Sequence, residues 1–139
     1  MEKIFFDSSA LIAIFNERDD NHKIAVDFFH QLIENGNYLF TTDYILDETF
    51  TMLKLRAGHH VASSVAKDII ENEEFEIIFI DKVIFDDAFK NYFNKVKDQP
   101  DLSFTDCTSF AVMKSLRIEK GFSFDKHFRL FKFQRVPIS

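Results

Sequence analysis

The chain has 139 residues, a formal net charge of −6, and a composition that is 46% hydrophobic and 29% charged. This length and balance predict one globular domain over residues 1–139, with a sizeable core. The single cysteine excludes a disulfide framework and a multi-cysteine zinc site. No apolar run approaches the ~18 residues of a membrane span, and the N-terminus lacks a signal-peptide pattern. We therefore expect a cytoplasmic protein with no membrane partner.

Apolar runs typical of buried strands alternate along the chain with segments of helical periodicity. Strands are expected at 3–6, 38–41, 75–80, 121–124 and, at an edge, 133–138. Helices are expected at 10–15, 22–35, 43–57, 59–73, 82–96, 103–117 and 125–131. This alternation predicts an α/β fold with a mostly parallel sheet of four to five strands and helices on both faces.

Two of the predicted strands end in an aspartate. Asp7 follows the run 3–6, and Asp125 follows the run 121–124. Ligands of parallel sheets bind beyond the carboxyl ends of the strands, so we expect these two carboxylates to lie side by side. For either residue alone, a helix-start acid stabilised by the helix dipole is the competing interpretation.

Glu48 lies on an apolar row of the helix predicted at 43–57. At helical spacing it shares this row with Ile45, Met52 and Leu55, whereas the adjacent Asp47 points to solvent. We expect Glu48 to face the core side, where a carboxylate is costly unless it is paired or bound to a metal. A Glu at the core boundary, with a buried stem and an exposed head, is the alternative.

Asp106 lies on the inward row of the helix predicted at 103–117. Phe110 and Met113 follow it at helical spacing, so the carboxylate is expected to face inward. Ser103 precedes it by three residues, and this Ser-x-x-Asp spacing also resembles a capping box. Both a helix-start role and a site role are therefore open.

No lysine or arginine lies on these inward rows to neutralise the four acids. Converging carboxylates repel one another and would not stay charged together without cations. Divalent metals with oxygen ligands resolve that repulsion, and Mg²⁺ or Mn²⁺ keeps open water positions suited to phosphodiester hydrolysis. The sequence therefore predicts an acidic metal site.

Four short motifs in this order resemble the PIN domain family. They are Phe-Asp-Ser-Ser-Ala-Leu-Ile at 6–12, Asp-Glu-Thr at 47–49, Leu-Ser-Phe-Thr-Asp-Cys at 102–107 and Phe-Ser-Phe-Asp-Lys-His-Phe at 122–128. Within that family the chain is most similar to the VapC-type ribonuclease toxins of prokaryotic toxin–antitoxin pairs. The resemblance covers essentially the whole chain.

The resemblance implies a three-layer α/β/α sandwich that binds Mg²⁺ or Mn²⁺ and cleaves RNA. The family's catalytic and metal-binding acids correspond to Asp7, Glu48, Asp106 and Asp125. Small polar residues that line the family's site correspond to Ser8 or Ser9, and to Ser123. Toxins of this type are homodimers that a separately encoded antitoxin inhibits.

The C-terminal segment is basic, with seven Lys or Arg and two acidic residues from position 114 onward. We expect Lys126, His127 and Arg129 to contact RNA phosphates, although an ordinary exposed helix would also explain them. Cys107 is expected to be a small buried residue rather than a nucleophile. The competing functions are a housekeeping or DNA-acting PIN nuclease and a catalytically silent PIN binding module.

Overall fold

The computed structural model describes residues 1–138 as an α/β fold; Ser139 lies outside the described residues. Its central sheet has five strands, all parallel, in the order β3-β2-β1-β4-β5. The strands are β1 (Lys3–Phe6), β2 (Tyr38–Thr42), β3 (Phe75–Ile78), β4 (Lys120–Phe122) and β5 (Gln134–Val136). This sheet confirms the predicted α/β class and the predicted four to five parallel strands.

Strand β1 occupies the middle of the sheet because its side chains are apolar on both faces. Ile4, Phe5 and Phe6 are each at most 2% exposed. Phe5 pairs with Phe40 of β2 on one side and with Gly121 of β4 on the other. A strand buried on both faces is expected where helices cover both sides of a parallel sheet. This pairing brings the two ends of the chain together in space.

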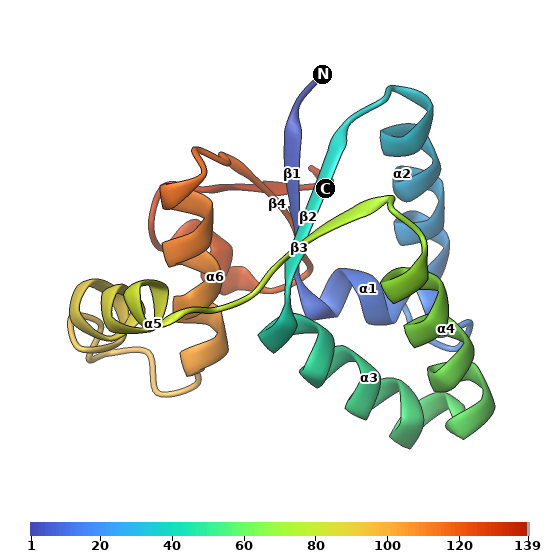
Figure 1. Ribbon diagram of the computed structural model, residues 1–139, viewed down its shortest axis with the longest axis horizontal. Helices are drawn as coiled ribbons and strands as arrows, with labels where there is room; N and C mark the ends of the chain where they lie inside the picture. The colour runs from blue at the N-terminus through green and yellow to red at the C-terminus, as the bar shows by residue number, and fades with distance from the viewer. Residues whose placement is uncertain (139) are drawn as a thin grey trace.

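Helices cover both faces of the sheet (Figure 1). They are α1 (Ser8–Phe15), α2 (His22–Glu34), α3 (Asp43–Ala57), α4 (His59–Glu71), α5 (Lys82–Ala88) and α6 (Phe104–Ser115). Helices α1, α2 and α4 lie on one side of the strands, and α5 and α6 on the other. Helix α3 starts at the carboxyl end of β2 and contacts α1 and α4. Within residues 1–138, none of these helices has the length and apolarity needed to cross a membrane.

Three elements differ from their predicted form. Strand β3 ends at Ile78, and the N–H of Ile80 donates a hydrogen bond to Asp43 Oδ1 at 2.9 Å. The helix predicted at 82–96 is α-helical only to Ala88 and continues as a π-helix over Phe89–Phe93. The helix predicted at 125–131 is a single 3₁₀ turn, η2 (Lys126–Arg129).

Gly121 allows this 3₁₀ turn to lie close to strand β4. A Cβ atom at Gly121 would lie 2.5 Å from the ring of Phe128, so no larger residue fits without moving that ring. Phe128 is fully buried, with ring centroids 6.3 Å from Phe5 and 5.4 Å from Phe110. The packing anchors the turn against the sheet and fixes the backbone around Asp125.

Candidate metal centre

A cleft of about 440 Å³ opens at the carboxyl ends of the parallel strands. Its lining includes all four acids that the sequence singled out, Asp7, Glu48, Asp106 and Asp125. They come from the end of β1, from α3, from α6 and from the loop after β4. Parallel topology thus gathers carboxylates that are far apart in the chain, as expected for a sheet whose ligand side is the carboxyl edge.

Asp7 is almost fully buried, with 3% of its surface exposed. It precedes α1 but makes no side-chain capping bond, so the helix-start interpretation does not account for it. Its Oδ2 accepts hydrogen bonds from the hydroxyls of Ser9 at 2.9 Å and Ser123 at 2.7 Å. Burial, followed by the charge of Asp106, raises the pKa of Asp7 from 3.8 to about 7. A bound cation would relieve the cost of keeping this group ionised.

Asp106 both caps α6 and lines the cleft. Its N–H donates to Ser103 Oγ at 3.0 Å, and the N–H of Ser103 donates to Asp106 Oδ2 at 3.1 Å. This is the reciprocal capping box predicted from the spacing. The residue is also 7% exposed, and burial, with a further contribution from the charge of Asp125, raises the pKa of Asp106 to about 6. Asp106 therefore fills the helix-start role, and its place in the cleft leaves the site role open to it as well.

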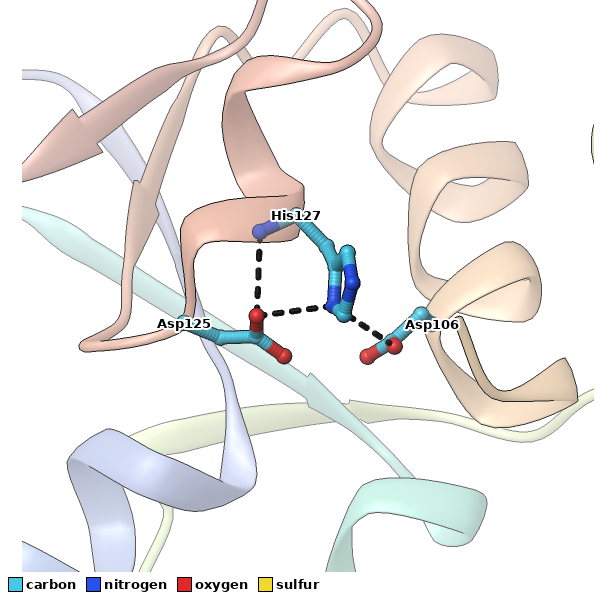
Figure 2. Close-up of side chains that lie close together, drawn as sticks. All are labelled: Asp106, Asp125 and His127. Carbon is cyan, nitrogen blue, oxygen red and sulfur yellow. Dashed lines mark hydrogen bonds and ion pairs between the residues drawn. The ribbon is translucent and has the colours of Figure 1, made fainter. Parts of the chain in front are cut away.

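The ring of His127 lies between Asp125 and Asp106 (Figure 2). Its Nδ1 is 2.8 Å from Asp125 Oδ1 and 3.6 Å from Asp106 Oδ2, and its Nε2 is 3.1 Å from Asp101 Oδ1. Within residues 1–138, Nδ1 has no partner in hydrogen-bond geometry, so its contact with Asp125 is electrostatic. Burial alone lowers the pKa of His127, but Asp125 and the other two carboxylates outweigh burial and raise it. In the metal-free protein the imidazole is therefore placed to bring positive charge among three acids, and it would have to give up a proton to bind a metal.

Asp106, Asp125 and His127 form the tightest candidate for a metal site. One ligand atom from each lies within 4.8 Å of the others. Asp7 and Glu48 line the same cleft but do not belong to this group of three. Serine hydroxyls donate hydrogen bonds to both of their carboxylates. The geometry therefore modifies the expected set of four carboxylate ligands by adding an imidazole. Oxygen and imidazole donors around a partly open cleft fit a divalent ion such as Mg²⁺ or Mn²⁺.

Glu48 is exposed, which corrects the expectation that its side chain faces the core, although Ile45 on the same row is fully buried. Leu55 on the same row is 75% exposed. The reason is that α3 begins at the carboxyl edge of the sheet and runs away from it (Figure 1), so Glu48 and Met52 of this row border the cleft. Glu48 Oε1 accepts a hydrogen bond from the hydroxyl of Ser8, which joins α3 to the start of α1.

The five residues expected to bind substrate lie in different places. Ser8 lines the cleft, whereas Ser123 is fully buried. Lys126 and Arg129 are exposed but are not among the residues lining the cleft. His127 is only 4% exposed, which corrects the expectation that its ring faces phosphates. In a 3₁₀ turn positions i and i+3 share a side, so 126 and 129 stay outside while 127 turns inward.

Sequence reasoning overlooked several residues that line this cleft, among them Asp19, Asp101 and Arg56. Asp101 belongs to a predicted turn, and no local pattern indicates that it meets His127. Arg56 follows Glu48 by eight residues on α3 and lines the same cleft. The helical spacing of Arg56 from Glu48 could have predicted this position, because residues i, i+4 and i+8 lie on one face of a helix. Arg56 is exposed and lies outside the predicted inward rows, so it does not contradict the expectation that no Lys or Arg lies on those rows.

The chain belongs to the PIN domain family, whose model matches residues 4–134. That span contains all four acids of the cleft. The chain is 29% identical over 134 residues to the 23S rRNA-specific endonuclease VapC20 of Mycobacterium tuberculosis, covering 96% of this chain and 97% of that protein. It is 27% identical over 125 residues to a VapC ribonuclease of Archaeoglobus fulgidus, covering 89% and 78% of the two chains.

Solved structures agree with this assignment. The crystal structure of Mycobacterium tuberculosis VapC20, a Sarcin-Ricin loop cleaving toxin, superposes with a TM-score of 0.81 at 28% identity. It covers 94% of this chain and 95% of the other. The VapBC2 structure from Rickettsia felis, bound to a DNA fragment from its promoter, has a TM-score of 0.65 at 11% identity over 96% of each chain. The second similarity concerns the fold alone.

Proposed function

We propose that this protein is a metal-dependent endoribonuclease and the toxin of a toxin–antitoxin pair. The observation that carries the proposal is the convergence of Asp7, Glu48, Asp106 and Asp125 on one cleft, with the pKa of two of them raised by burial. The names of the relatives, an endonuclease specific for 23S rRNA and a ribonuclease, support RNA as the substrate class.

The residues of the cleft fit a divalent cation, which we infer to be Mg²⁺ or Mn²⁺. When bound, such an ion neutralises the carboxylates and lowers the pKa of a coordinated water for attack on phosphorus. Asp106 and Asp125 would hold it together with the His127 ring, whose atoms are already within reach of both. Asp7, fixed by two serine hydroxyls, would add a further carboxylate from the floor of the cleft.

The remaining polar groups position these ligands. Ser123 Oγ donates to Asp7 and accepts the N–H of Asp125, so one hydroxyl orients two strand-end acids. Asp101 accepts at the far side of the His127 ring and fixes its plane. Glu48, on the open side of the cleft, would ligate directly or orient a bound water. Such outer partners are typically worth about 10–100-fold in metal affinity or activity.

We also infer a cognate antitoxin protein, a homodimer and a cytoplasmic location. The likeness to VapC proteins and the single cysteine support these assignments. Large apolar side chains are exposed around β3 and α5, including Phe79 at 70% and Val83 at 77%. Exposed apolar surface of this kind is typical of protein contacts.

The test is cleavage of a mixed RNA pool with Mn²⁺ by the wild type, Asp7→Asn and Asp47→Asn. Asp47 is an exposed carboxylate that lies outside the cleft lining, so its variant controls for loss of one charge. We expect Asp7→Asn to lose more than about a hundredfold, because even partners outside the ligand set are worth about 10–100-fold. Asp47→Asn and the wild type should cleave equally, and EDTA should stop both. A fully active Asp7→Asn protein would sink the proposal.

Calorimetric titration with Mn²⁺ separates the competing functions. Metal uptake without cleavage of RNA would favour a silent PIN module. Cleavage of DNA in place of RNA, or expression that leaves growth unaffected, would favour a DNA-acting or housekeeping PIN nuclease.

A further inference from the structure

The cleft is acidic, yet it holds one arginine. Six carboxylate residues line it, and among the described residues of that lining Arg56 is the only Lys or Arg. RNA brings its own negative charge to any such site, so its phosphates must be held near carboxylates that repel them. A cation at the rim is therefore needed where the strand passes the acids.

Arg56 lies on the same face of α3 as Glu48 and Met52, which precede it by eight and four residues. Eight residues of helix rise by about 12 Å, so Arg56 stands two turns from the Glu48 end of the cleft. Its side chain is exposed, and its guanidinium forms no ion pair or hydrogen bond with any other residue in 1–138. A guanidinium without a protein partner is available to an anion.

A second hollow of about 370 Å³ adjoins the cleft at Arg56, which lines both. Phe15, Arg18 and Val61 are among its other lining residues. Arg18 is exposed, and Phe15 is half-buried. A strand of RNA that left the acids over Arg56 would therefore meet a second cation, Arg18, and the aromatic residue Phe15. Beside them lies Glu17, the one carboxylate among the described residues of this lining.

We propose that Arg56 binds an RNA phosphate flanking the scissile one, and that the strand continues into the hollow beside Arg18. This assignment rests on the proposed function. The guanidinium matches a phosphate with two parallel hydrogen bonds, which gives geometric register as well as charge. Arg56 is thus a substrate-positioning residue on the exposed side of the cleft.

Lys54 offers a matched control on the same helix. Both residues lie in the last turn of α3, where positive charge stabilises the helix end. Lys54 is exposed but lines neither hollow. Arg56→Ala and Lys54→Ala therefore remove the same charge and the same helix-end stabilisation, and only one of them removes the proposed phosphate contact. Thermal unfolding of the two variants should agree.

The experiment measures binding of a fluorescent single-stranded RNA to the Asp7→Asn protein in Mg²⁺, which leaves the RNA intact, over a series of salt concentrations. Adding Arg56→Ala should weaken affinity on the order of tenfold, the worth of a charged hydrogen bond. It should also lower the slope of log affinity against log salt by about 0.7, the value for one phosphate contact on a single strand. Adding Lys54→Ala should change neither.

Two results separate this proposal from the function on which it rests. Suppose that the wild type cleaves RNA, but that Arg56→Ala and Lys54→Ala give the same RNA affinity and the same salt slope. The proposed phosphate contact is then overturned, while the nuclease function stands. Arg56 would in that case belong to a protein contact. If the wild type fails to cleave RNA, the proposed function is overturned first, and the phosphate contact falls with it.

Discussion

The two sides of the cleft differ in how the protein holds them. On the floor, Asp7 and Asp106 are nearly buried, fixed by serine partners, and have raised pKa values. On the α3 side, Glu48 and Arg56 are exposed. Burial makes a carboxylate costly and gives it a strong demand for a cation, whereas solvent screens an exposed charge. We therefore expect the buried acids of the floor to control cleavage and the pH dependence of stability, and the exposed residues of α3 to control substrate binding.

The largest expected effect is the pH dependence that the floor imposes on stability. The folded pKa of Asp7, about 7, exceeds its ordinary value of 3.8, so the folded protein binds this proton more tightly than the unfolded chain. Stability of the metal-free protein should therefore fall as the pH rises from about 4 to about 7. Asp106 acts in the same direction between about 4 and about 6.

Asp7→Asn should remove the larger part of this dependence. Without metal at pH 8, we expect the variant to be more stable than the wild type by a few kcal/mol, since each unit of pKa shift corresponds to about 1.4 kcal/mol. At pH 4 the two proteins should converge. Urea unfolding in EDTA at pH 4 and at pH 8 measures this difference in unfolding free energy. A variant less stable than the wild type at pH 8 would contradict the raised pKa.

Glu48→Gln tests the exposed side with a smaller expected effect. We expect cleavage to fall by about tenfold, at the lower end of the range for groups that act around a metal site. The unfolding free energy should stay within about 0.5 kcal/mol of the wild type at every pH, because the side chain is exposed. Initial cleavage rates and urea unfolding give the two readouts. If Glu48→Gln changed the pH dependence of the unfolding free energy as strongly as Asp7→Asn, the contrast between the floor and the α3 side of the cleft would be wrong.

Cys107→Ala is expected to have the smallest effect on activity. The thiol is fully buried next to Asp106 in the chain, and burial raises the pKa of Cys107 to about 11, so it is not a nucleophile near neutral pH. We expect unchanged cleavage and a loss of about 1 kcal/mol in stability from the small cavity. Native protein should also resist iodoacetamide. Loss of cleavage by a well-folded variant would assign the thiol a role.

The alternation of apolar runs and helical segments was sufficient to predict the fold class, because period-2 and period-3.6 patterns are local properties of the chain. The capping box at Ser103 and Asp106 is equally local, since three residues separate its partners. That Asp7, Glu48, Asp106 and Asp125 act in metal binding and cleavage stays a prediction, as does the single domain over 1–139.

Other features depended on neighbours that no local pattern reveals. Glu48 was predicted to face the core because its row is apolar, but α3 leaves the sheet and Glu48 borders the cleft. His127 was predicted to contact RNA phosphates from a short helix, but the close approach of Phe128 to Gly121 anchors a 3₁₀ turn that carries the imidazole inward. Both depend on packing between segments distant in the chain.

The sequence by itself determined the class of the fold and the four acids that are candidates for the site. Both are recognised from local patterns, namely the hydrophobic periodicity and the carboxylates at the ends of predicted strands. The expectation that the strand ends carrying Asp7 and Asp125 lie side by side is confirmed by the parallel pairing of β1 with β4. Only the tertiary structure decided that His127 stands between Asp125 and Asp106, and that Arg56 shares their cleft. The physical reason is that these contacts depend on packing between segments distant in the chain, which periodicity within one segment does not encode.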